Sequence, residues 1–173
     1  AGGSPLPAAA AGGRSRCPPI RRSPHRVVNF LLDEQLHDAV ARALDAIGQL
    51  DGHAFTHVYD HRAGGTPDER FPELCRDLSV GVLVTGNVRD FGARKVHYQG
   101  LLDAGIHVVV LRWGKASPYP NVQLGMLANG YRRILVLLEE AAEPVLIRVT
   151  PSGVAEPRTL GELVAEIEGE IPS

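Results

Sequence analysis

The chain has 173 residues, 44% of them hydrophobic, which is enough for one domain with a buried core. No apolar run approaches the ~20 residues of a membrane span, so we expect no membrane partner. Residues 1–26 hold five of the 18 basic residues and none of the 20 acidic ones. The remaining residues therefore hold 13 basic and 20 acidic side chains, a net charge of −7. An acidic body argues against a broad nucleic-acid binder and suits a protein that gathers carboxylates around a cation.

The two cysteines, Cys17 and Cys75, provide neither a disulfide framework nor the spacing of a metal knuckle. A reducing compartment fits this usage best, so we expect a cytoplasmic protein.

Residues 1–25 consist mainly of Ala, Gly, Pro, Ser and Arg. Such a segment cannot bury enough apolar surface to fold alone, and we expect a disordered basic tail before a folded domain at 26–173. Its arginines are either a phosphate-seeking arm or a solvated tail.

Strands and helices alternate along the folded part. The expected strands are 27–32, 53–58, 81–84, 106–111 and 145–149, with a short antiparallel return at 154–156. The expected helices are 35–47, one opened by Thr66 and Pro67, 93–104, 122–140 and 160–171. This order predicts an α/β fold with three layers, α/β/α, around a mostly parallel sheet.

Polar residues follow three of these elements. Asp33 comes directly after the first strand, Asp68 opens the helix after the second, and Asn87 and Asp90 follow the third. Because the carboxyl ends of parallel strands share one edge, we expect these side chains to meet there.

Helical spacing separates the members of the two acidic pairs. Asp33 lies three residues before Leu36 in an apolar stripe with Val40, Leu44 and Ile47, so it is expected to point inward and Glu34 outward. Asp68 likewise precedes Phe71 and Cys75, whereas Glu69 is expected to complete a capping box with Thr66.

Several carboxylates in one cleft repel each other unless a cation lies between them. Mg²⁺ and Mn²⁺ prefer oxygen ligands, and a water on such an ion can attack a phosphodiester. Each acid also has a structural explanation when taken alone: Asp33 as a helix cap, Asp68 as a partner of the helix dipole, Asp90 as a loop acid. The hypothesis therefore depends on their convergence.

Three segments in order, 30–34 (FLLDE), 65–69 (GTPDE) and 82–87 (VLVTGN), resemble the PIN-like ribonuclease family, and 148–151 (RVTP) with Gly153 resembles its branch of VapC-type toxins. The resemblance implies a PIN-like fold, an Mg²⁺- or Mn²⁺-dependent ribonuclease, an antitoxin protein as partner and a homodimer. By position, Asp33 matches the first acidic ligand and Asp68 the second.

The chain departs from the family at the third acidic position. The family has Thr-x-Asp there, whereas Thr85 and Gly86 are followed by Asn87, a neutral and poorer ligand for a hard cation. Asp90, three residues further on, is the carboxylate that would replace it.

Thr85 is suited to orient a ligand or a water, and we assign it with Arg89, Arg94 and Lys95 to RNA binding. The three basic residues are equally explained as a solvated helix start. His53, His57 and His61 do not share a helical face, so no histidine metal site is expected. Trp113 and Tyr119 are either base-stacking or packing residues.

The sequence thus predicts a metal-dependent endoribonuclease, the toxin of a toxin–antitoxin pair, with Asp33, Asp68, Asp90 and Asn87 in the catalytic site. The alternative is a PIN-like module that binds RNA or protein without cutting, which Asn87 favours. A nucleotide-binding domain of another kind is disfavoured, because no glycine-rich phosphate loop follows the first strand.

Overall fold

The computed structural model describes residues 27–86, 95–113 and 119–154, together with Pro157, Thr159 and Glu162. The predicted basic tail, the segment that contains Asn87 and Asp90, and nearly all of the predicted helix 160–171 lie outside these residues. Among the described residues, no helix is both long and apolar enough to cross a membrane.

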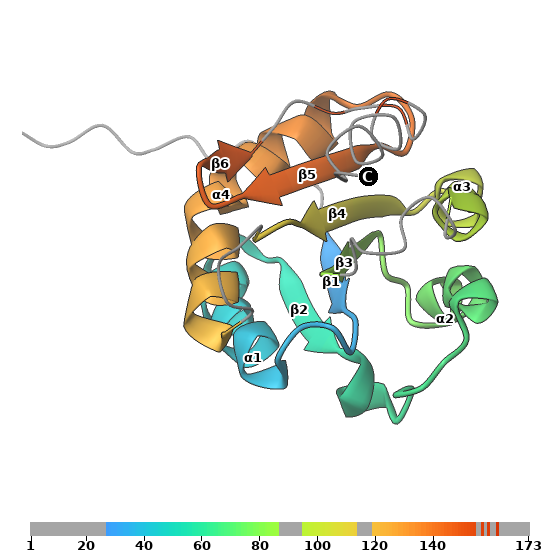
Figure 1. Cartoon of the computed structure of the whole chain (residues 1–173), viewed down its shortest axis with the longest axis horizontal. Helices are drawn as coiled ribbons and strands as arrows, with labels where there is room; N and C mark the ends of the chain where they lie inside the picture. The colour runs from blue at the N-terminus through green and yellow to red at the C-terminus, as the bar shows by residue number, and fades with distance from the viewer. Residues whose placement is uncertain are drawn as a thin grey trace, which may run out of the picture.

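Six strands form one sheet in the order β2-β1-β3-β4-β5-β6 (Figure 1). They are β1 (Asn29–Leu32), β2 (Ala54–His57), β3 (Val82–Thr85), β4 (His107–Leu111), β5 (Leu146–Thr150) and β6 (Gly153–Val154). The first five run parallel, and β6 pairs antiparallel with β5. The mostly parallel sheet predicted from the sequence is therefore confirmed.

Helices cover both faces of this sheet (Figure 1). They are α1 (Asp38–Gly48), α2 (Phe71–Asp77), α3 (Lys95–Asp103) and α4 (Pro120–Glu140), with the short 3-10 helices η1 (Gln49–Asp51), η2 (Val58–His61) and η3 (Asp68–Arg70). α1 and α4 pack on one face, and α2 and α3 on the other. These layers give the PIN-like α/β/α arrangement that the sequence predicted.

The alternation of side chains along the strands builds two cores. In β1, Phe30 and Leu32 face α1 and α4, whereas Leu31 faces α2 and α3. Phe30 stacks on Phe55 of β2 with ring centroids 4.3 Å apart. Every residue of β3 is buried, as expected for a strand covered on both faces.

Helix α1 begins at Asp38, three residues later than predicted. A carboxylate oxygen of Asp33 accepts the Gln35 N–H at 2.9 Å, and His37 caps the helix by accepting the Ala39 N–H at 3.2 Å. These bonds hold 33–37 as a loop. Asp33 is buried by this loop and not by an extended helical stripe.

The prediction that Ile47 belongs to the buried stripe is wrong, because its side chain is 42% exposed. Gly48 takes the sheet-facing position at this end of α1. A Cβ there would lie 2.9 Å from the Phe55 ring, so only glycine allows this approach of helix and strand.

The predicted capping box of Thr66 and Glu69 is also wrong. The Thr66 hydroxyl donates to the Ala63 carbonyl at 2.6 Å, and no side chain caps η3. Pro67 is the residue that precedes η3, and the α-helix starts only at Phe71. Glu69 is exposed, which leaves Asp68 as the inner member of the pair.

Candidate functional site

The sheet reverses its strand order beside β1. β1 pairs with β2 on one side and with β3 on the other. In open parallel sheets, ligands bind outside the carboxyl ends of the strands at this kind of switch point. Asp33 directly follows β1, and its N–H donates to the Val84 carbonyl of β3 at 3.0 Å. The first predicted site residue therefore lies at the switch point.

A hollow opens at this edge, on the side of α2 and α3. Asp33, Asp68 and Thr85 come from the ends of three different elements and line it together. The remaining lining residues are Phe71, Leu83, His97, Tyr98 and Leu101. The hollow thus combines two carboxylates, a hydroxyl and an imidazole above an apolar base.

The Asp33 carboxyl is only 8% exposed. Burial raises the pKa of Asp33 to about 7, because the apolar surroundings disfavour the charged form. Hydrogen bonds from the Thr85 side chain and the Gln35 N–H act in the opposite direction, and the charges of Glu34 and Asp68 add to the rise. The ionised form of Asp33 is therefore unfavourable in this site, and a nearby cation would stabilise it.

Asp68 is half-buried at the start of η3 and faces the same hollow. The segment before it is tied to the Asp33 loop, because the exposed Glu34 carboxylate accepts the Gly65 N–H at 2.9 Å. The two acidic pairs are thus divided between inward aspartates and outward glutamates, although no continuous helix causes the division at Asp33.

The other predicted site residues are Asn87, Arg89, Asp90, Arg94 and Lys95. Asn87, Arg89, Asp90 and Arg94 lie outside the described residues. Lys95 is the first residue of α3, and its side chain lies outside them as well. Within the described part of the chain, no three His, Cys, Asp or Glu residues come close enough together to hold a metal.

His97 and Tyr98 line the hollow, although neither was among the site residues predicted from the sequence. Tyr98 and Leu101 are buried and three residues apart, so they mark the inward face of α3. His97 is four residues before Leu101 and flanks that face. Helical spacing places His97 beside this face only once Tyr98 is known to be buried.

The histidines at the two ends of β2 form hydrogen bonds with backbone groups. His53 Nδ1 accepts the Val28 N–H at 3.1 Å, and the fully buried His57 contacts Leu36 and Tyr59.

Trp113 is half-buried and packs over Gly86, where a Cβ would lie 2.8 Å from its Cζ3 atom. Tyr119 is 65% exposed and precedes α4.

Residues 28–112 match the family model described as PIN like domain. The matched segment runs from just before β1 to just after β4, so it contains Asp33, Asp68 and Thr85. The fold and this match support a PIN-like domain, a class whose members are often nucleases. The match does not distinguish the VapC-type branch. No curated protein and no solved structure matches the chain.

Proposed function

We propose that this protein is a metal-dependent endoribonuclease whose Asp33 and Asp68 bind Mg²⁺ or Mn²⁺. The observation that carries the proposal is the buried Asp33 carboxylate facing a second carboxylate in a hollow at the switch point. A divalent cation between the two would relieve both the burial cost and the repulsion of like charges.

The donor set fits a hard cation. The two carboxylates and the Thr85 hydroxyl offer oxygen ligands, and Mg²⁺ commonly keeps several waters beside one or two carboxylates. Asp90, five residues after Thr85, would be the third carboxylate ligand, and Asn87, two residues after Thr85, would belong to the catalytic site.

A bound cation would supply an activated water and stabilise the charge that develops on the phosphate. The chain supplies the positioning. The Gln35 N–H and the Thr85 side chain fix the orientation of the Asp33 carboxylate. His97 faces the same hollow, and we propose that it contacts RNA together with Thr85, Arg89, Arg94 and Lys95.

The first test is cleavage of a pool of single-stranded and structured RNA with Mg²⁺, Mn²⁺ or EDTA. We expect cutting with either metal, none with EDTA, and a loss of at least about 100-fold in Asp33→Asn and in Asp68→Asn. Asp103→Asn is the matched control, because Asp103 accepts the Gln99 amide at the far end of α3. Equal cleavage by all variants would place the activity elsewhere.

The second candidate is a PIN-like module that binds RNA or protein without cutting. Asn87 favours it, because an amide replaces the third acidic ligand of the family pattern. A folded wild type that binds RNA but does not cut it with either metal would support this function. Recovery of cutting in Asn87→Asp would then show that the site had lost a single charge.

We further propose that the protein is the cytoplasmic toxin of a toxin–antitoxin pair, acting as a homodimer and neutralised by a partner protein. The support is the resemblance of residues 148–151 and Gly153 to the VapC-type branch. Induced expression is expected to arrest growth, and Asp33→Asn is expected to abolish the arrest. Growth arrest that persists in Asp33→Asn would argue against a toxin that acts by cutting RNA.

A further inference from the structure

The loop of residues 33–37, here called the Asp33 loop, connects β1 to α1 and carries the buried carboxylate. Its first two residues contact β3 and the segment before η3: the Thr85 side chain bonds to the Asp33 carboxylate, and the Glu34 carboxylate accepts the Gly65 N–H at 2.9 Å. The Asp33 N–H donates to Val84 at 3.0 Å, the Gln35 N–H to the Asp33 side chain at 2.9 Å, and the Leu36 N–H to the Asp33 carbonyl at 3.1 Å. The carbonyls of Gln35 and Leu36 and the N–H of His37 take their partners from distant elements.

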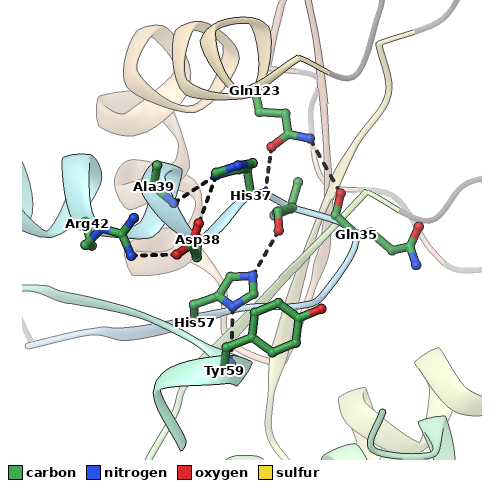
Figure 2. A network of polar contacts seen from close by, with 9 residues as sticks. Gln35, His37, Asp38, Ala39, Arg42, His57, Tyr59 and Gln123 are labelled. Atoms are coloured by element: carbon green, nitrogen blue, oxygen red, sulfur yellow. Dashed lines mark hydrogen bonds and ion pairs between the residues drawn. The ribbon is translucent and has the colours of Figure 1, made fainter. Parts of the chain in front are cut away.

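Gln123 provides the first of these partners. It lies in the first turn of α4 and is 2% exposed. Its Oε1 accepts the His37 N–H at 2.9 Å, and its Nε2 donates to the Gln35 carbonyl at 3.5 Å (Figure 2). One amide therefore holds both flanks of Leu36 from a position 86 residues away in sequence from His37.

His57 provides the second. It ends β2 and is 0% exposed. Its Nδ1 accepts the Tyr59 N–H at 3.2 Å, so the ring proton lies on Nε2, which donates to the Leu36 carbonyl at 2.9 Å. Figure 2 shows His57 and Gln123 on opposite sides of the loop. The loop is held between β2 and α4 by two buried side chains.

We propose that Gln123 and His57 are positioning residues that fix the Asp33 loop so that its carboxylate faces Asp68 and Thr85. This inference rests on the proposed function, since the orientation matters only if the carboxylate binds a cation. A buried carboxylate would gain solvation by turning outward. Bonds to β3 and to Gly65 hold Asp33 and Glu34, whereas Gln123 and His57 hold residues 35–37, the half of the loop that leads into α1. Partners of this kind typically change metal affinity by 10- to 100-fold.

The test is direct Mn²⁺ binding in the absence of RNA. Binding is measured by the loss of the electron paramagnetic resonance signal of free Mn²⁺. Gln123→Met keeps the side-chain length and removes both loop bonds. His57→Asn keeps an oxygen that can cap Tyr59 and cannot reach Leu36, so it removes only the bond to the loop. We expect each variant to bind Mn²⁺ about tenfold more weakly than wild type.

The matched control is His53→Leu. His53 is buried like His57, accepts one backbone N–H, and lies at the other end of β2, about 13 Å away along the strand. It should lose stability in urea unfolding and keep wild-type Mn²⁺ affinity. The urea curves also establish that each variant is folded at the start of the titration.

The outcomes separate the two proposals. Unchanged Mn²⁺ affinity in folded Gln123→Met and His57→Asn, beside a binding wild type, would overturn the positioning role and leave the nuclease proposal intact. An equal loss of affinity in His53→Leu would also overturn it, because general destabilisation would then be the cause. A folded wild type that binds no Mn²⁺ would overturn both proposals.

Discussion

The two edges of the central sheet use polar side chains in different ways. At the amino-terminal edge, His53 accepts the Val28 N–H and His107 accepts the Val145 N–H, each at 3.1 Å. Each bond satisfies the backbone N–H of the residue directly before a strand, β1 or β5. At the carboxyl-terminal edge, the buried Asp33 carboxylate faces a second carboxylate, that of Asp68.

Structural and functional burial can be separated on this basis. A buried imidazole that satisfies a backbone group contributes to stability. A buried carboxylate beside another carboxylate opposes folding in its ionised form, and its pKa rises as a result. Burial alone does not identify a functional site. A buried side chain whose charged form is disfavoured by its surroundings does.

The largest expected effect is a difference in sign between the two edges. Asp33→Asn should raise the free energy of unfolding at about pH 8 by about 2–4 kcal/mol, because the ionised carboxylate is lost. His53→Leu should lower it by about 1–3 kcal/mol, because the Val28 N–H loses its partner. Urea unfolding in EDTA measures both.

The pH dependence follows from the raised pKa. Asp33 keeps its proton in the folded protein up to about pH 7 and loses it near 3.8 when unfolded. Wild-type stability should therefore fall as pH rises between these values and level off above about pH 7. Asp33→Asn should lack this fall. Parallel stability curves for wild type and variant would mean that the Asp33 carboxyl is solvated and that burial does not raise its pKa.

A second comparison uses the two ends of β3. Gly86→Ala would place a Cβ 2.8 Å from Cζ3 of Trp113, whereas a Cβ at Gly81 would meet no atom within 4 Å. We expect Gly86→Ala to cost about 1–3 kcal/mol through overpacking, and Gly81→Ala to change stability by no more than about 0.5 kcal/mol. Thermal unfolding at one pH is sufficient.

Trp113→Leu provides the internal check on this pair. Removing the indole should make room for the new methyl group, so Gly86→Ala should cost less in that background. An unchanged cost would mean that Trp113 is not the obstacle.

The sequence was sufficient for the layers of the fold and for the edge on which Asp33 lies. The strands are short apolar runs between turn signals, and alternation with helices dictates a parallel sheet. The sequence was insufficient where a local contact decides a boundary. The start of α1 depends on the Asx-type bond of Asp33 to Gln35, and the Thr66 hydroxyl turns back to Ala63.

Long-range polar partners also escape sequence reasoning. Nothing near Gln123 indicates that its amide contacts Gln35 and His37, because these residues are brought together only by the packing of α1 against α4. The position of His97 at the site was not predicted for a related reason. A histidine on a helix has no spacing signature until the neighbouring Tyr98 is known to be buried.

The smallest expected effect concerns the outer member of the first acidic pair. Glu34→Gln keeps an oxygen acceptor for the Gly65 N–H and removes a charge that raises the pKa of Asp33. The pKa should move down from about 7, by less than burial has moved it up. Carbon-13 detection of the Asp33 carboxyl through a pH titration measures the shift. Glu69→Gln is the control, because Glu69 is the exposed outer member of the second acidic pair. A shift of the same size in both variants would mean that Asp33 responds to the overall charge of the domain, and the contrast between inner and outer acids would lose its local basis.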